Sequence, residues 1–272
     1  MFHLAKGYRM LVGCGLLAMV APPATAAEPK TLDTLDAEIA DSPDDPQSYV
    51  SRAKRHSSAG RHPEAIADLD RAIKLDPDAG QVIDFRGSER LLAGQFDEAI
   101  SDFDRFLAKH PDQAPYHWKR GIALYYAGRY DDGVKQFDLH QTVNRADVEN
   151  AVWRYLCMAR RDGVEAARRA LLKVGPDARV PMAQIYDLYA GKTATDVFAA
   201  ARAGEPSAAE LRVRLFYAHL YIALDLDARG DSPKAIEHLK LAVDKNLVEH
   251  YMGGIAQVHL AVLEKQAERG KQ

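Results

Sequence analysis

Small and apolar residues recur along residues 46–147 with a period of 34 residues. In a frame whose units begin at Pro46, Gly80 and Ala114, four positions repeat in residue type. These are the eighth (Ala53, Gly87, Gly121), the fifteenth (Gly60, Gly94, Gly128), the twentieth (Ala65, Ala99, Gly133) and the twenty-fourth (Leu69, Phe103, Phe137). Apolar residues at helical spacing lie on both sides of each glycine, so the pattern predicts two helices per unit.

Each repeated position has a physical role in a helical hairpin. Glycine at the fifteenth position ends the first helix, because glycine adopts the left-handed conformation at no steric cost. Small residues at the eighth and twentieth positions let the two helices approach closely, and the larger residue at the twenty-fourth fills the space between them. Pro77 and Pro111, at the thirty-second position, end the second helix. One hairpin cannot bury its own apolar face, so the units must stack.

The segments YVSRAKRHSSAGRHPEAIADLDRAIKLDP and FRGSERLLAGQFDEAISDFDRFLAKHP follow the pattern of the tetratricopeptide repeat, and the chain resembles that family. The resemblance implies an all-α fold, a right-handed α-solenoid of helix-turn-helix repeats with a concave groove. It also implies a protein that binds other proteins.

The repeat frame predicts how the whole chain is organised. After a gap it returns at residues 216–249, where Gly230 and Ala235 take the fifteenth and twentieth positions. The last helix should close the C-terminal end of the stack, as a terminal cap does in solenoids. The expected segments are a signal peptide (1–27), an N-terminal capping helix (28–45), three tandem repeats (46–79, 80–113, 114–147), degenerate helical hairpins (148–215), a fourth repeat (216–249), and a C-terminal capping helix and tail (250–272).

The N-terminus has the features of a secretory signal peptide. Lys6 and Arg9 precede an apolar run at residues 10–21 that is short for a membrane span, and small residues follow at 24–26. We expect cleavage there and a periplasmic location; an uncleaved anchor helix is the alternative. Cys14 follows a lipobox-like sequence, but at the start of the apolar run rather than its end, so an outer-membrane lipoprotein is the weaker interpretation. No later apolar stretch has membrane-spanning length.

Composition and charge limit the function. The chain is 47% hydrophobic and 28% charged, as in ordinary soluble globular proteins, and its formal net charge of −3 gives no basic face for nucleic acid. Cys157 is the only cysteine that remains after cleavage, so it cannot form an internal disulfide. It is expected to be a small buried hydrophobe, with an intermolecular or redox thiol as the alternative.

The sequence shows no recognisable catalytic or metal-binding motif. The ten histidines show no metal-ligand spacing, and we expect no catalytic residue, no metal and no cofactor. The pairs Asp68/Asp70 and Asp102/Asp104 recur with the period, which favours a solvated helix face. Arginines that follow the second aspartate of each pair, such as Arg105, are expected to form ion pairs between repeats.

The order of regular and irregular units suggests a closer family resemblance. Three regular repeats are followed by a degenerate hairpin with "VWRYL", an irregular stretch with "IYDLYAGK", and a last repeat with "FYAHLYIALDLDARGDSPKAIEHLKLAVDKN". This layout resembles the NlpI-like family of bacterial envelope lipoproteins. The resemblance implies a non-catalytic adaptor that docks cell-wall hydrolases or a protease. The chain lacks that family's cysteine at the end of the signal peptide, which puts the lipid anchor and the partners in doubt.

Family positions that face the groove supply the candidate binding residues. These are Trp118, Ile122, Tyr125, Tyr126, Leu91 and Lys54. The third repeat contributes an aromatic cluster, and large aromatic residues often anchor interfaces. Alternatively, Trp118 and Tyr125 pack against the next repeat. The predicted function is a periplasmic scaffold for protein or peptide partners; a cell-envelope enzyme on a helical scaffold and a structural homodimer are the alternatives.

Overall fold

The computed structural model describes residues 30–270, so the predicted signal peptide and Cys14 lie outside the described residues. Residues 30–270 form helices and no β-strand. The helices are α1 (Leu32–Asp41), α2 (Pro46–Ser58), α3 (His62–Leu75), α4 (Gly80–Leu92), α5 (Phe96–Lys109), the 3₁₀ helix η1 (Pro111–Tyr116), α6 (Trp118–Tyr126), α7 (Tyr130–Gln141), α8 (Val148–Asp162), α9 (Val164–Arg169), α10 (Met182–Tyr189), α11 (Ala194–Arg202), α12 (Ala208–Ala228), α13 (Ser232–Lys240), the π-helix η2 (Leu241–Lys245) and α14 (Tyr251–Arg269). None of these helices has both the length and the apolar character needed to cross a membrane.

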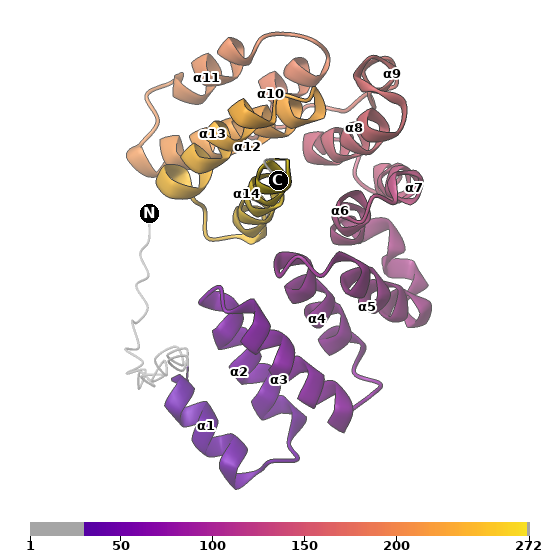
Figure 1. Ribbon diagram of the computed structural model, residues 1–272, viewed down its shortest axis with the longest axis vertical. Coiled ribbons are helices and arrows are strands. Elements are labelled where there is room, and N and C mark those ends of the chain that lie inside the picture. Colours follow the sequence, from indigo (N-terminus) through magenta and orange to yellow (C-terminus); the bar gives the residue numbers. More distant parts are fainter. Residues whose placement is uncertain (1–29, 271–272) are drawn as a thin grey trace, which may run out of the picture.

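The helices pack in successive pairs that stack into a curved solenoid (Figure 1). α2 packs on α3, α4 on α5 and α6 on α7, and α3 and α5 also contact the helix that follows them. The stack continues through α8 and then curves back, so that α12 and α13 lie on the opposite side of the curve from the N-terminal pairs (Figure 1). The predicted all-α solenoid is confirmed.

Glycines make the turns and the close helix contacts that the repeat pattern predicts. Gly60, Gly94 and Gly128 have φ of 69°, 76° and 73°, in the left-handed region that favours glycine. Gly121 serves a different purpose, since a Cβ atom on it would lie 2.5 Å from Cζ of Phe137. The small eighth residue therefore makes room for the aromatic ring at the twenty-fourth position.

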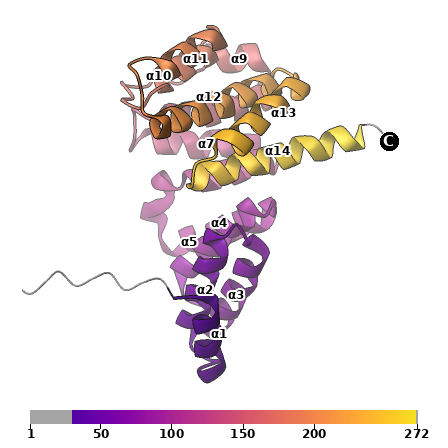
Figure 2. The same cartoon turned by 90° about the vertical axis from the view of Figure 1, so that its left-hand side faces the viewer.

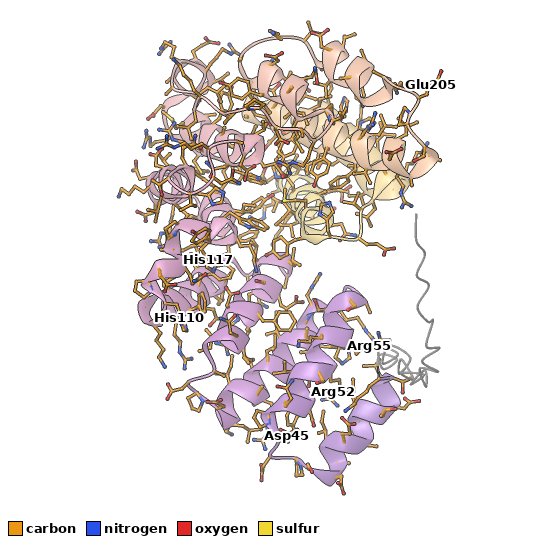
Figure 3. The ribbon with its side chains drawn as sticks, turned by 180° about the vertical axis from the view of Figure 1, so that it is seen from behind. Asp45, Arg52, Arg55, His110, His117 and Glu205 are labelled. Atoms are coloured by element: carbon orange, nitrogen blue, oxygen red, sulfur yellow. The ribbon has the colours of Figure 1, made fainter. Side chains whose placement is uncertain are left out.

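Arginines at the seventh position of each unit form a ladder of ion pairs between neighbouring helices. Arg86 donates hydrogen bonds of 2.8 and 2.6 Å to Asp102 of its own unit, and one of 2.6 Å to Asp70 of the preceding unit. Arg52, labelled in Figure 3, contacts Asp68 in the same way. The full ladder is Arg52, Arg86, Arg120 and Arg154.

The ladder corrects one expectation about the recurring aspartates. Asp68 and Asp102 are 5% and 3% exposed, whereas Asp70 and Asp104 face solvent. The expectation of a solvated face was therefore wrong for the first aspartate of each pair. A buried carboxylate is tolerated here because an arginine of the first helix pairs with it and hydrogen-bonds to it. Of the arginines that follow the second aspartates, Arg71 forms the expected ion pair, with Asp44 at 3.0 Å, whereas Arg105 donates to the carbonyl of Pro77.

The C-terminal helix α14 lies inside the hollow of the solenoid (Figure 1), and its C-terminal end projects beyond the neighbouring helices (Figure 2). It packs against α13 and reaches across to α4. Its Tyr251 hydroxyl donates a 3.2 Å hydrogen bond to the carbonyl of Ser88, and a Cβ on Gly254 would lie 2.7 Å from Leu92 Cδ2. The helix expected to close the end of the stack thus also forms an inner layer of the concave side.

Cys157 is fully buried on α8, as expected for a small hydrophobic residue. Burial raises the pKa of its thiol to about 12, so the reactive thiolate is scarce at neutral pH. A Cβ on Gly133 would lie 2.7 Å from its Sγ atom, which shows how closely α7 packs on it.

Two histidines make the contact between α12 and α13 sensitive to pH. Nδ1 of His219 lies 3.0 Å from Nδ1 of His238, so at least one ring must be neutral to accept the hydrogen bond from the other. Burial lowers the pKa of His219 from 6.5 to about 4 and also lowers that of His238. Unfolded chains bind these protons more readily, so stability is full above pH 6.5 and falls as the pH drops towards 4.

We therefore expect His219→Gln to reduce the acid sensitivity of the fold by about 1–2 kcal/mol, since glutamine does not titrate. Urea denaturation of wild type and variant at pH 7.5 and pH 4.5 measures this difference. The variant should lose less stability between the two pH values, even if it is less stable at pH 7.5. An equal loss in both proteins would contradict the assignment.

Candidate functional site

A cavity of about 200 Å³ lies where α14 meets α6 and α8. We call it the tryptophan cavity. It is lined by Trp118, Ile122, Phe137, Asp147, Glu149, Asn150, Trp153 and Met252. The chain contains two tryptophans, and both line this cavity. A cavity that holds benzene measures about 150 Å³, so this one has room for a single large side chain.

The third repeat places Trp118 at the start of α6. Pro115 lies in the 3₁₀ helix η1, so α6 begins at Trp118, four residues after the start of the repeat unit. The side chain of His117 caps the helix by accepting a hydrogen bond from the backbone N–H of Arg120. The Trp118 ring then meets Tyr251 of α14 edge-on, with the ring centroids 5.3 Å apart.

Helix α8 supplies the floor of the tryptophan cavity. Trp153 is 2% exposed and packs edge-on against Tyr125, with the ring centroids 5.5 Å apart. The indole Nε1 of Trp153 and Oδ1 of Asn150 are buried, and neither has a hydrogen-bond partner among the described residues. Most buried polar atoms in folded proteins have a partner, so these two are exceptions in the cavity wall.

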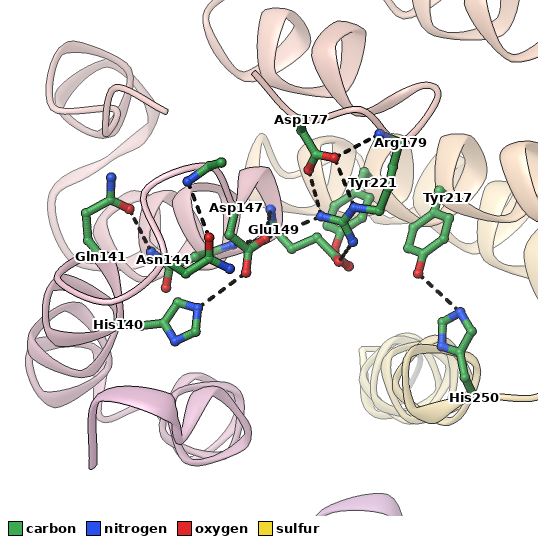
Figure 4. Close-up of polar contacts among 12 residues, drawn as sticks. His140, Gln141, Asn144, Asp147, Glu149, Asp177, Arg179, Tyr217, Tyr221 and His250 are labelled. Atoms are coloured by element: carbon green, nitrogen blue, oxygen red, sulfur yellow. Dashed lines mark hydrogen bonds and ion pairs between the residues drawn. The ribbon is translucent and has the colours of Figure 1, made fainter. Parts of the chain in front are cut away.

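Two of the residues that line the cavity, Asp147 and Glu149, are acidic, and they belong to a charged cluster around one arginine beside the cavity (Figure 4). Arg179 donates to Glu149 at 2.5 Å and to Asp177 at 2.7 Å, and it lies 3.5 Å from Asp147. The Tyr221 hydroxyl donates to the other oxygen of Glu149 at 2.5 Å. We call Asp147, Glu149, Asp177 and Arg179 the acidic rim.

The surroundings of the acidic rim keep its aspartates ionised. Burial alone would raise the pKa of Asp147, but the His140 ring, whose Nε2 lies 3.4 Å from Oδ2, and the charge of Arg179 hold that pKa below the usual value. Burial likewise opposes ionisation of Asp177, and the hydrogen bonds from Arg179 outweigh it, so the pKa of Asp177 is also lowered. These two side chains therefore carry negative charge at neutral pH.

A second and larger hollow lies beside the tryptophan cavity. This N-terminal cleft, about 890 Å³ in volume, separates α2 and α4 from residues 247–257. Lys119 lies in it, with its Nζ atom 5.4 Å from the centroid of the Tyr251 ring and 3.9 Å from a carboxylate oxygen of Asp84. The start of α14 contributes Met252 to the cavity and Tyr251 to the cleft, so the two hollows are neighbours.

The structure places the candidate groove residues in different surroundings, and three of them lie at or near the hollows. Trp118 and Ile122 line the tryptophan cavity. Tyr126 stacks on Phe96 and contacts His259 of α14 with a 3.2 Å hydrogen bond, so it is covered by the chain itself.

The remaining candidates do not meet at this site. Leu91 and Tyr125 are buried in the core, because the neighbouring helices cover them, and they are not groove-surface residues in this structure. Lys54 is exposed on α2 and lines neither hollow. Packing of Tyr125 against Trp153 matches the alternative that this aromatic residue contacts the next repeat.

Three important cavity residues were not among the candidates. Trp153 and Glu149 belong to the degenerate hairpin, where the repeat pattern is weak. Continuing the 34-residue frame beyond residue 147 puts Glu149 at the second position of a unit. The family resemblance places that position, like those of Trp118 and Ile122, on the groove, so a signal for Glu149 was present. Met252 has no such signal, because it reaches the cavity only when α14 turns back into the hollow.

Comparison with known proteins agrees with the helical-repeat fold. The family model described as tetratricopeptide repeat matches residues 86–147. A tetratricopeptide repeat protein from Parabacteroides merdae is similar in structure, with a TM-score of 0.51 and 15% identity over 86% of this chain and 91% of that chain. YrrB, a tetratricopeptide-repeat protein with an unusual peptide-binding site, aligns with a TM-score of 0.43 and 17% identity over 83% and 97% of the two chains. No curated protein sequence matches the chain.

These comparisons show that residues 86–147 match the tetratricopeptide repeat and that the solenoid fold is similar to that of a known tetratricopeptide repeat protein. The matched residues include most of the second unit of the 34-residue frame and all of the third, and the structural likeness extends over most of the solenoid. Repeats of this kind typically form non-catalytic scaffolds that bind proteins or peptides.

Proposed function

We propose that this protein is a non-enzymatic scaffold that binds a protein or peptide partner on its concave side. The tryptophan cavity carries the proposal. It combines apolar walls from Trp118, Trp153 and Met252 with a small number of polar groups, as recognition pockets do. Tryptophan pockets often supply much of the binding energy at interfaces, because one anchoring side chain buries a large area.

We further propose that the protein acts in the periplasm of a bacterium. The signal-peptide pattern at residues 1–27 supports this location, and the absence of a cysteine at residues 24–28 favours a form without a lipid anchor. The NlpI-like layout of the repeats suggests cell-wall hydrolases or a protease as partners. Incubating the purified protein alone with peptidoglycan tests the non-enzymatic part, since turnover by the protein itself would contradict it.

Replacing Trp118 by alanine should weaken partner capture at least tenfold, because the cavity loses one aromatic wall. Wild type and variant are crosslinked in periplasmic extract, and the co-purifying proteins are quantified, with helicity checked by circular dichroism. Tyr116→Ala is the matched control, since Tyr116 is 58% exposed and lies two residues away outside the cavity. Equal capture by wild type and Trp118→Ala would overturn the proposed site.

A further inference from the structure

We infer that the tryptophan cavity selects a partner segment that presents a lysine or arginine side chain. The inference rests on the proposed function and adds the chemistry of the recognised residue. It follows from three features: the excess of carboxylates at the acidic rim, the aromatic walls beside them, and a similar arrangement already formed by a lysine of the chain itself.

The acidic rim has more negative than positive charge. Asp147, Glu149 and Asp177 surround the single guanidinium of Arg179, which leaves a formal excess of two negative charges. Asp147 and Glu149 also line the cavity, and their side chains are partly open to solvent, at 21% and 17% exposed. A cation in the cavity would lie close to both carboxylates, where the reduced dielectric strengthens the attraction.

The cavity walls suit the rest of such a side chain. Ile122 and Met252 offer apolar surface to an aliphatic stem, and the indole of Trp118 lines the same cavity, within which it can contact a cationic head group. Long basic side chains bury their stems and keep the charged end near polar groups. The volume of about 200 Å³ is enough for one such side chain.

Other side chains would fit less well. A carboxylate would be repelled by the acidic rim. A purely apolar side chain could fill the volume, but it would remove water from Asp147 and Glu149 without replacing the lost interactions, and desolvating an ionised carboxylate is costly.

A lysine of the chain itself already adopts the proposed arrangement in the neighbouring N-terminal cleft. Lys119 lies 5.4 Å from the Tyr251 ring centroid and 3.9 Å from the Asp84 carboxylate. The combination of an ammonium group, an aromatic ring and a carboxylate therefore occurs in the wall of the N-terminal cleft, next to the tryptophan cavity. The tryptophan cavity offers the ring and the carboxylates without a lysine of its own.

The test uses a display library of random dodecapeptides selected against the protein, with Trp118→Ala as the counter-selection target. Enriched peptides are synthesised and titrated by intrinsic tryptophan fluorescence, which reports on this cavity because both tryptophans line it. We expect each to carry a lysine or arginine beside apolar residues. Replacing that residue by norleucine, which removes only the charged group, should lower affinity at least tenfold.

The matched variants on the protein are Glu149→Gln, which removes charge from the acidic rim, and Glu64→Gln, which removes an exposed charge on α3. Glu149→Gln should weaken the lysine peptide but not the norleucine peptide, and Glu64→Gln should affect neither. If Glu149→Gln misfolds, the exchange to norleucine still decides the question. Peptides that need Trp118 but no basic residue would overturn this inference alone. Failure to obtain any peptide dependent on Trp118 would count against the proposed function as well.

Discussion

Replacing Asp102 by alanine is expected to lower the free energy of unfolding by about 3–5 kcal/mol, since removing one partner of a buried ion pair leaves the other charge uncompensated. Asp102 is 3% exposed and accepts hydrogen bonds from two arginines. Arg86 donates at 2.8 and 2.6 Å, and Arg90 donates at 2.8 Å. The substitution therefore leaves two partly buried guanidinium groups without their main partner, and urea denaturation measures the loss.

Asp104→Ala is the matched control for this prediction. Asp104 lies on the same helix two residues further on, its side chain is 48% exposed, and it pairs with Arg120 at 2.6 Å. Exposed ion pairs contribute about 0–1 kcal/mol, so this variant should remain close to wild type. Similar losses for both variants would show that burial of the Asp102 carboxylate does not determine how much its ion pairs contribute to the free energy of unfolding.

The turns and helical pairs could be predicted because residues within one repeat unit determine them. Gly60, Gly94 and Gly128 end helices through their own backbone conformation, so a fixed spacing in the sequence becomes a fixed spacing of turns. Small residues such as Gly121 oppose a large ring one helix later, and both positions fall within one repeat unit. The helical pairs follow from these positions.

The arginine ladder was harder to predict, although its members keep the same period. The sequence offers two sets of arginines, at the seventh position and directly after the aspartate pairs, and spacing does not decide between them. Helix packing does decide which set pairs with the buried aspartates. Arg86 projects between two second helices and reaches Asp102 and Asp70, whereas Arg105 donates to the carbonyl of Pro77 and Arg71 pairs with the exposed Asp44. Asp102 can be buried because Arg86 reaches it and neutralises its charge.

The tryptophan cavity could be predicted only in part. Trp118 and Ile122 stand at repeat positions that face inward, so the frame identifies them. The position of Met252 depends on the curvature that accumulates over the whole stack, because that curvature sets where α14 returns. The distance between Met252 and Trp118 along the chain means that no local pattern links them.

The start of α14 packs so closely that one added methyl group should displace the helix. The substitution Gly253→Ala tests this expectation. A Cβ on Gly253 would lie 2.2 Å from the backbone oxygen of Val248, which cannot rotate away as a side chain would. The helix must shift, and we expect a loss of about 2 kcal/mol, since overpacking typically costs 1–3 kcal/mol and alanine regains some helix propensity. Met252 should move with it, so tryptophan fluorescence should change in the folded protein.

Gly254→Ala is the matched control on the same helix. Its Cβ would meet only the end of the Leu92 side chain, at 2.7 Å from Cδ2, and that side chain can change rotamer at low cost. We expect its free energy of unfolding to lie within about 1 kcal/mol of wild type, because the gain in helix propensity offsets the contact. Chemical denaturation and the emission spectrum of the native state distinguish the two variants. If Gly253→Ala is as stable as Gly254→Ala and leaves the emission unchanged, the turn before α14 does not hold Met252 in the cavity wall, and the concave side tolerates movement of its inner helix.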